Sequence, residues 1–545
     1  MRIRHTAAAL AIAAALSLTT TACNDEAFLT EQPIDFVGPA NFYRNSDDAL
    51  AAVNGVYAGF VNTSSSNYYG GLFVMLVEFP TEMMTPYLSA PNERSQVDNY
   101  SYTPSHNYIY QSWLYAYAAI NRANGVIERV PGISMDATLR DRVVGEAKFL
   151  RALNYFNLVR LFGGVPLRTT ETTGLEGIQQ PRATAAEVYA QIVSDLEGAV
   201  ATLPGTAGYG ANDVGRATRG AAKTLLAKVY MQRAGTGVSA SASADWQAAL
   251  ALLQDVAASK EYKLLENYGD LFDMKHEVNS EVIFDIQASR SPGLGQRLSN
   301  QCAPRKSNYG TSQNGSFTAE QPFFDAYAIK TVAKTGGGVD TTLLDKRRAV
   351  TWQLSFVNRD NPPKIVPWTA TATAAGDYGA DTPYMRKCLD SLSVGYDEQN
   401  YIILRYADNL LMESETINEI SGPTTAAYAG VNEVRVRAGL EPLVGGLSQS
   451  AFRDSVFAQR RIELTFEGPH GYFDSQRNWA WSSKQIKKAM ILGEDTKFKL
   501  SKYPKLNPFG RDPNTPIPDK FKLMPIPQRA IDLNPVLRGQ QNAGW

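Results

Sequence analysis

Metal-binding and nucleophilic residues are scarce in this chain. Its 545 residues include 4 histidines and 3 cysteines. No two cysteines form a C-x-x-C pair, so a zinc site built from Cys and His has almost no ligands to draw on. The G-x-S-x-G elbow of many hydrolases is also absent, as are the G-x-x-x-x-G-K-[ST] phosphate loop, the H-E-x-x-H zinc motif and the D-x-[DN]-x-[DN]-G calcium loop. We therefore expect no catalytic residue, no metal site and no cofactor.

An excess of positive charge is missing as well. Lys and Arg together number 53, and Asp and Glu number 54, whereas nucleic-acid binding usually requires a basic surface. Hydrophobic residues make up 44% of the chain and the mean hydropathy is -0.26. These values are typical of a globular protein with a large core. DNA and RNA are therefore poor candidates for a partner.

The beginning of the chain has the features of an export signal. A basic start precedes an apolar run at residues 7–18, and small residues lead to Cys23. The apolar run is too short to span a membrane. The sequence before Cys23 resembles a bacterial lipobox, in which the cysteine is lipidated, although Thr20 stands where leucine is usual. We predict a signal peptide at 1–22 and a lipidated tether at 23–45; the alternative is an ordinary secretory signal cleaved elsewhere.

One strongly patterned helix lies within residues 145–167. Its apolar residues recur at steps of three and four, which places them on one broad helical face. The polar residues fall largely on the opposite face: Arg151, Asn154, Asn157 and Arg160. Gly163 and Gly164 tolerate a left-handed backbone and Pro166 prevents the helix from resuming, so the helix should end there. We predict a packing helix with no catalytic role.

Helical patterns recur along the chain in pairs with short connections. Such pairs are the repeating unit of helical solenoids, and here they resemble tetratricopeptide helices of irregular length. The predicted helices span 47–60, with Ser46 as N-cap, and 111–130, 136–162, 184–203, 217–233, 243–258, 402–420, 424–438 and 450–466. One strand is predicted at 281–287. Two long stretches, 62–103 and 262–400, lack helical periodicity, and insertions of this length are more often functional than incidental.

Five sequence blocks together resemble one family, the SusD/RagB outer-membrane nutrient-binding lipoproteins. They are YAAINRANGVIERV (117–130), GEAKFLRALNYFNLVRLFGGVPL (145–167), GRATRGAAKTLLAKVYMQ (215–232), ILRYADNLLMESETIN (403–418) and RRIELTFEGPHGYFDSQRNW (460–479). Residues 432–440 and 523–545 agree as well, so the resemblance covers nearly the whole mature chain. It departs from the family pattern at His470, where the family usually has an arginine followed by an aromatic pair.

The resemblance implies a mainly α fold. Tetratricopeptide-like helical pairs would form a right-handed superhelical scaffold, with a long loop-rich insertion and little β structure. It implies a single domain over residues 46–545, in which the stretches at about 62–103 and 262–400 bind the ligand.

The resemblance also implies a function. Such a protein is lipid-anchored at the outer membrane and exposed on the cell surface, where it captures an oligosaccharide or another nutrient. It delivers this ligand to a SusC-like TonB-dependent transporter, for which it forms the lid, and it is not an enzyme. Because ligand contacts vary within the family, two alternatives stay open: capture of a peptide, and a protein-interaction scaffold whose helical pairs bind protein.

A glycan site requires a particular set of side chains. Sugars present apolar C–H faces ringed by hydroxyls, so exposed aromatic planes with amide and charged groups at their edges are needed. From the two loop-rich stretches we predict ligand contacts by Tyr68, Tyr69, Tyr87, Asn92, Arg94, Arg305, Tyr309, Trp352 and Trp368. The alternative for each is that it packs a loop against the body. Residues on or just before a predicted helix are assigned to the core: Tyr108, Trp113, Tyr115 and Tyr117.

Other titratable residues are assigned structural roles. Glu463 and Glu467 are four residues apart and could form an acid/base pair. Beside Arg460 and Arg461 they are better explained as an ion-pair network. His470 is interpreted as a helix-end or core histidine.

Two cysteines, Cys302 and Cys388, remain in the mature chain besides Cys23. An exported protein can join such a pair in a disulfide. The sequence leaves both states open, as it does the binding of a structural calcium ion.

Overall fold

The described part of the chain is mainly helical. A computed structural model describes residues 42–545 except 62–67, 88–91, 292–294, 305, 311–313, 328, 334–338, 344, 368–382, 394–395, 469, 496–506 and 513. Within these residues, no helix combines the length and the apolarity needed to cross a membrane. The expected fold class, mainly α with little β structure, is confirmed.

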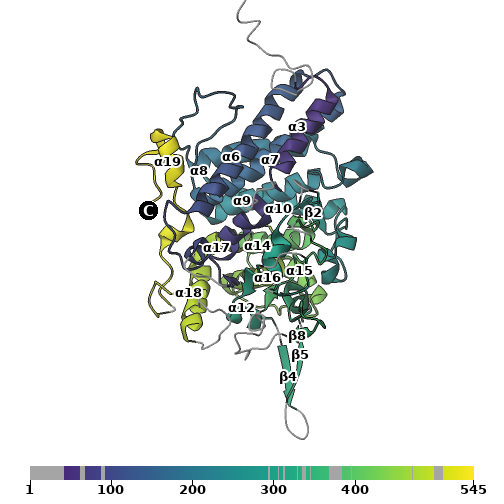
Figure 1. Cartoon of the computed structure of the whole chain (residues 1–545), viewed down its shortest axis with the longest axis vertical. Helices are drawn as coiled ribbons and strands as arrows, with labels where there is room; N and C mark the ends of the chain where they lie inside the picture. Colours follow the sequence, from purple (N-terminus) through teal and green to yellow (C-terminus); the bar gives the residue numbers. More distant parts are fainter. Residues whose placement is uncertain are drawn as a thin grey trace, which may run out of the picture.

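Consecutive long helices stack to form the upper part of the molecule in Figure 1. Helix α7 (Ala137–Phe162) packs between α6 (Asn107–Arg129) and α8 (Ala185–Thr202). Helix α9 (Arg219–Gly235) in turn contacts α8 and α10 (Ala242–Ser259). Each helix thus buries its apolar face against its neighbours in the chain, as in tetratricopeptide-like repeats.

The series of helix pairs continues through the C-terminal half of the chain. Helix α14 packs against α10, α15 and α16. The α-helices not yet given are α3 (Ser46–Ala58), α4 (Phe73–Glu78), α5 (Glu93–Asp98), α11 (Leu298–Cys302), α12 (Gln321–Asp325), α13 (Arg347–Thr351), α14 (Tyr406–Ser421), α15 (Thr425–Arg437), α16 (Gln449–Leu464), α17 (Gly471–Arg477), α18 (Trp479–Asp495) and α19 (Gln528–Leu533). A π-helix, η1 (Tyr68–Leu72), precedes α4.

Local sequence explains where the packing helices begin and end. The Asp136 side chain accepts the backbone N–H of Leu139 at 2.8 Å and so caps the start of α7. Gly163 ends α7 with φ of 70°, a left-handed value that costs glycine little. Thr184 and Glu187 form a reciprocal capping box at the start of α8. The predicted ends of these two helices are therefore correct.

Several predicted boundaries were wrong, among them the start of α6, which begins at Asn107 and not at residue 111. Asn45 rather than Ser46 caps α3, because the Asn45 side chain accepts the N–H groups at the first turn. The segment predicted to open a helix at 402–420 begins instead as strand β10 (Tyr401–Arg405). This strand pairs antiparallel with β2 (Val282–Ile286), which confirms the strand expected at 281–287. The β-branched and aromatic residues of β10 suit a strand, and tertiary pairing overrides the helical period that follows.

Helix α7 is buried on both its apolar and its polar sides. Arg151 is 4% exposed and forms a two-pronged ion pair with Asp195, with N–O distances of 2.8 and 2.7 Å. The Arg160 guanidinium lies 3.8 Å from the ring centroid of Phe156 and 3.9 Å from that of Phe473. The polar stripe therefore joins neighbouring elements to α7.

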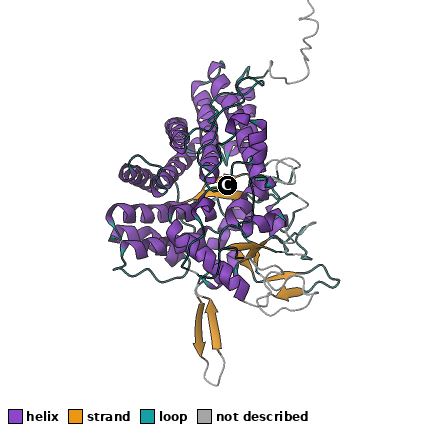
Figure 2. Cartoon of the chain, turned by 90° about the vertical axis from the view of Figure 1, so that its left-hand side faces the viewer, coloured by secondary structure: helices purple, strands orange, loops and turns teal. Residues whose placement is uncertain are grey.

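The strands are short and form four small sheets. One sheet has four strands, in the order β1 (Met84–Pro86), β3 (Phe317–Ala319), β9 (Tyr384–Met385) and β6 (Trp352–Gln353). The other three sheets have two strands each. They pair β10 with β2, β4 (Ile329–Ala333) with β5 (Val339–Leu343), and β7 (Ser355–Val357) with β8 (Ile365–Pro367). The β4–β5 hairpin projects from the body in both views (Figures 1 and 2). All these strands come from the two stretches predicted to be loop-rich, except β10, which lies at the end of the second.

A buried ion network ties the second loop-rich stretch to the C-terminal helices. Glu463 binds Arg405 at 2.6 Å and Arg347 at 2.9 Å, and it also pairs with Arg437. The network balances four cations with four carboxylates: Arg347, Lys387, Arg405 and Arg437 with Glu281, Asp345, Glu463 and Glu467. An ion-pair network at Glu463 and Glu467 is thus confirmed, but its cations come from other segments and not from α16.

The two arginines of α16 have partners of their own. Arg460 binds Asp408 at 2.8 Å and Asp474 at 2.9 Å. Arg461 pairs with Glu82, which follows α4. His470 is 5% exposed and lies beside the Arg460 cluster, so its assignment to a buried structural position is confirmed.

Candidate ligand-binding site

The four-stranded sheet brings the two loop-rich stretches together. Strand β1 comes from the first stretch, and β3, β6 and β9 come from the second. Met84 lies opposite Ala319, while Tyr384 on β9 lies opposite both Thr318 and Gln353. Residues more than 200 positions apart in the chain therefore become neighbours at the ends of these strands.

Two predicted aromatic residues flank strand β9. Tyr87 directly follows β1, and its backbone N–H donates to the Ser316 carbonyl at 3.1 Å. Its ring meets the Tyr384 ring edge-on, with centroids 5.4 Å apart. The Tyr309 hydroxyl accepts from the Gln353 side-chain amide at 2.8 Å. Both Tyr87 and Tyr309 are half-buried.

Arg94 and Asn92 sit at the start of α5, the helix that follows β1 in the chain. The Asn92 side chain accepts the backbone N–H of Arg94 at 3.0 Å and that of Ser95 at 3.3 Å, so it caps the helix. Arg94 donates through Nη1 to the Ser316 hydroxyl. The structure thus gives Asn92 a capping role and places the Arg94 side chain beside the end of β3.

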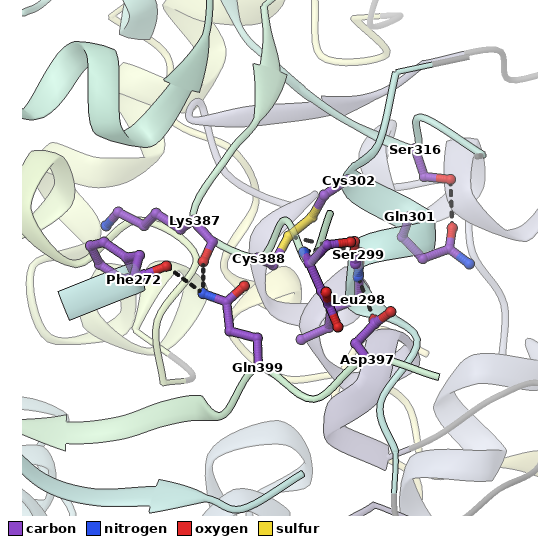
Figure 3. The surroundings of a disulfide bond; sticks show 11 residues. Phe272, Leu298, Ser299, Gln301, Cys302, Ser316, Lys387, Cys388, Asp397 and Gln399 are labelled. Carbon is purple, nitrogen blue, oxygen red and sulfur yellow. Dashed lines mark hydrogen bonds between the residues drawn. A yellow bond between two sulfur atoms is a disulfide. The ribbon is translucent and has the colours of Figure 1, made fainter. Parts of the chain in front are cut away.

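The Arg94 contact continues into a second hydrogen bond. The Ser316 hydroxyl donates to Oε1 of Gln301 at 2.6 Å, and the Ser316 backbone N–H donates to the Gln301 carbonyl at 2.5 Å (Figure 3). Gln301 lies on α11. The chain of bonds therefore connects α5, β3 and α11 around the predicted site.

A disulfide holds α11 in place beneath this surface. Cys302 and Cys388 are bonded, with their Cα atoms 6.5 Å apart, and the bond joins the end of α11 to the segment that follows β9 (Figure 3). The backbone N–H of Ser299 adds a hydrogen bond to Asp397 at 2.6 Å, and burial raises the pKa of Asp397 to about 7. Since a disulfide that closes a long loop contributes about 2–4 kcal/mol, this bond is a substantial constraint on the region.

Three of the predicted contact residues are core residues. Tyr68 is 1% exposed, while Tyr69 and Trp352 are 0% exposed. Asn157 on α7 donates to both tyrosine hydroxyls, and burial raises the pKa of Tyr68 well above its usual value. The rings of these residues have no exposed face in this structure, so they are not part of the surface formed by Tyr87, Arg94 and Tyr309. Arg305 and Trp368 lie outside the described residues.

Two family models match most of the chain. One, described as the SusD family, matches residues 280–545; the other, described as starch-binding associating with outer membrane, matches residues 61–231. The chain belongs to the SusD/RagB family.

Other SusD-like proteins match along most of their length. SusD-like protein P2 of Formosa agariphila is 27% identical over 483 residues, which cover 84% of this chain and 88% of the relative. SusD-like protein P25 of the same organism is 26% identical and covers 94% of each chain.

Solved structures share the SusD/RagB fold. A SusD homolog from Bacteroides thetaiotaomicron superposes with a TM-score of 0.75 at 24% identity, covering 93% of this chain and 98% of that one. A laminarin-binding SusD-like protein gives a TM-score of 0.67 at 23% identity, covering 92% and 100%. Surface glycan-binding protein A from Bacteroides uniformis gives 0.69 at 20% identity, again covering 92% and 100%. At this level of identity the likeness establishes the fold alone.

Three residues at the site of this SusD/RagB protein were missed from the sequence: Gln301, Ser316 and Tyr384. Serine and glutamine in a loop carry no pattern that distinguishes a site residue from a solvated one. Tyr384 belongs to a strand of two residues, which is too short to show alternation.

Two grooves of the described surface lie elsewhere. They have volumes of about 500 and 250 Å³ and run beside β2, and none of the predicted contact residues that the structure describes lines either. The aromatic residues in their walls include the buried Phe60 and Phe284 and the half-buried Tyr57 and Tyr209. Across the described residues, no group of three or more His, Cys, Asp or Glu side chains is arranged to hold a metal ion.

Proposed function

We propose that this protein binds a glycan at the surface formed by Tyr87, Arg94 and Tyr309 and delivers it to a transporter without chemical change. The observation that carries the proposal is the four-stranded sheet, which gathers these three residues from two distant stretches. Half-buried tyrosine rings can contact the C–H faces of a sugar, and a guanidinium can donate to its oxygens.

The relatives support a carbohydrate ligand. Two structures of the same fold are named as a laminarin-binding and a surface glycan-binding protein. Together with the tyrosines at the sheet, these relatives favour glycan binding over the two alternatives, peptide capture and a protein scaffold. Because both of these structures are named for binding, they also favour a binding role over catalysis.

The proposal includes a location and a partner. Residues 1–22 act as a lipoprotein signal, Cys23 carries the lipid, 23–45 form a tether, and 46–545 form a single domain on the outer surface of the cell. A SusC-like TonB-dependent transporter receives the glycan, with this protein as its lid. The lipobox-like sequence supports the anchor, and one matching family model is described as associating with the outer membrane.

Binding of defined oligosaccharides by the full-length protein in detergent tests the proposal. In isothermal calorimetry, Tyr309→Ala should weaken glycan binding by roughly tenfold, the loss expected for one aromatic contact together with its buried area. Tyr110→Ala, a half-buried tyrosine on α6 away from the sheet, is the matched control and should leave the affinity unchanged. Binding of peptides with no carbohydrate bound would favour peptide capture, and chromatographic detection of cleaved glycan would contradict a non-catalytic role.

The anchor and the partner have their own test. Replacing Cys23 with alanine should release the protein from the membrane fraction, and a tagged wild-type chain should co-purify a TonB-dependent transporter from native membranes. A wild-type protein that is found outside the membrane fraction although Cys23 is intact would contradict the lipid anchor. A wild-type chain that purifies without a transporter, under conditions that preserve other outer-membrane complexes, would contradict the partner.

A further inference from the structure

Arg94 differs from the buried Arg151, Arg347, Arg405 and Arg460 in having no carboxylate partner. Its side chain donates to the neutral Ser316 hydroxyl, and among the described residues it forms no ion pair. Glu93 precedes it on α5, but consecutive helical residues do not face each other. Asp98, four residues further along α5, is buried and accepts a hydrogen bond from the Thr85 hydroxyl at 3.3 Å. The adjoining stretches 88–91 and 311–313 contain no Asp or Glu in their sequence. The site thus carries a positive charge that the described protein does not neutralise.

The hydrogen bonds at Arg94 run in one direction. A guanidinium only donates, so Ser316 must accept from Arg94 and use its single hydroxyl proton to donate to Oε1 of Gln301. This fixes the Gln301 amide with its NH2 group directed away from Ser316 (Figure 3). The free groups that the Arg94–Ser316–Gln301 chain presents are therefore N–H donors, and they suit a ligand group with several acceptor oxygens.

Basic residues also lie on the Tyr309 side of the surface. Arg359 is exposed and donates to the Gly310 carbonyl at 3.0 Å, next to Tyr309. Lys364, which follows on the same segment, is exposed too. Asp360 is the acid of this segment, and it accepts from Asn358 at 2.9 Å. With Lys306, whose carbonyl accepts from the Arg359 N–H at 2.9 Å, three cations and one acid among the described residues thus lie on the two segments beside Tyr309.

We propose that the site selects anionic glycans, whose carboxylate or sulfate group is bound by Arg94. The inference rests on the proposed glycan-binding function and names its substrate class. A guanidinium donates two parallel N–H bonds to a carboxylate or a sulfate, an arrangement that a neutral hydroxyl cannot match. Ser316 and Gln301 act as positioning residues, because they fix the guanidinium without themselves being charged.

Calorimetry with three probes tests the charge preference. The probes are short oligogalacturonides, which carry carboxylates, sulfated galactan oligosaccharides, and neutral laminari-oligosaccharides. Full-length protein should bind one of the anionic probes roughly tenfold or more tightly than the neutral probe, as expected for a charge-assisted bond. The preference should shrink as salt is added, because salt screens a partly exposed pair. The two anionic probes distinguish a carboxylate ligand from a sulfate ligand.

Variants then assign the preference to Arg94. Arg94→Gln should lower the affinity for the anionic probe roughly tenfold, to the level of the neutral probe, and should abolish the salt dependence. Arg44→Gln is the control and should change neither, because Arg44 is an exposed arginine that precedes α3 and pairs with Asp48. Ser316→Ala should weaken anionic binding by a few-fold with the salt dependence retained, since the charge remains and only its position is loosened. Ser316→Thr, which restores the hydroxyl, should recover the affinity.

The outcomes separate the two proposals. Equal affinity for neutral and anionic probes, without salt dependence, would overturn the anionic preference and leave glycan binding in place. An anionic preference unchanged in Arg94→Gln would overturn the role of Arg94. Binding of no carbohydrate probe at all would overturn the proposed function itself. Thermal melting of each variant confirms that folding is retained.

Discussion

Buried carboxylates have pKa values shifted in opposite directions in two regions of the molecule. The two regions are the C-terminal helices and the second loop-rich stretch. On α14, α16 and α17, cations hold the pKa values of Asp408, Glu463 and Asp474 below their usual range. In the loop-rich stretch, burial without a strong cation partner raises the pKa of Asp285 to about 6 and that of Asp397 to about 7. Asp408, Glu463 and Asp474 thus take part in fixed ion pairs, whereas Asp285 and Asp397 are held by neutral hydrogen bonds.

This difference bears on function. A cation needed for ligand binding must not be neutralised by the protein itself, and Arg94 meets that condition because its partner is a hydroxyl. Arg405, Arg437 and Arg460 are instead committed to carboxylates, which fixes the scaffold but leaves them unable to bind a ligand. This difference between the two regions can be tested by substituting one carboxylate in each region and one helix-capping residue at the site.

The largest effect is expected from Glu463→Gln. The substitution removes one negative charge from a network of four cations and four carboxylates and leaves a net buried positive charge, which should cost about 3–5 kcal/mol of unfolding free energy. The lowered pKa of Glu463 gives this carboxylate a stabilising effect above its unfolded pKa of 4.5, an effect lost as the pH falls below that value. The loss of stability in acid should therefore be shallower in the variant.

Urea unfolding at several pH values measures this effect. Asp519→Asn is the control, since Asp519 pairs with Lys522 at the surface, with side chains 77% and 41% exposed. An exposed pair of this kind contributes about 0–1 kcal/mol. A Glu463→Gln variant no less stable than Asp519→Asn would show that the network does not determine stability.

An intermediate effect of opposite sign is expected from Asp397→Asn. The raised pKa of Asp397 means that the folded state holds its proton more tightly than the unfolded state, whose pKa is 3.8. Its ionisation therefore destabilises the fold as the pH rises from about 4 through about 7. An asparagine can still accept from the Ser299 N–H and donate to the Ser393 hydroxyl, which now bond to the two carboxylate oxygens.

The variant should consequently match the wild type near pH 4, and its advantage should grow by on the order of 2 kcal/mol between pH 5 and pH 8. Urea unfolding between these pH values is the measurement, and Glu463→Gln provides the contrast because its effect lies at lower pH. Parallel stability curves for Asp397→Asn and the wild type across this range would show that Asp397 is ionised in the folded protein at pH 5.

The helices could be predicted from the sequence because their signals are local. The apolar period of α7, its Gly163 stop and the Thr184 capping box of α8 all lie within a few residues of the structure they specify. The site depends on pairings such as Met84 with Ala319, which no local pattern encodes. The position of Tyr68 also depends on a distant residue. Its loop-like surroundings predicted exposure, whereas in the structure it is buried and its hydroxyl accepts a hydrogen bond from Asn157 on α7.

The smallest effect concerns Asn92, which was predicted to contact the ligand and instead caps α5. Asn92→Ala should remove the cap, at a local cost of about 1 kcal/mol, and weaken glycan binding by a few-fold because Arg94 lies in the first turn of that helix. Asn92→Ser should restore both the cap and the affinity, because serine is an effective N-cap. A serine is too short to replace a direct contact from asparagine, so equal weakening by Ala and Ser would identify Asn92 as a ligand contact after all. Ser448→Ala, which removes the corresponding cap from α16, should leave the affinity unchanged and control for the loss of a cap elsewhere. Calorimetry for the affinity, with hydrogen exchange of α5 for the cap, separates the two roles of this residue.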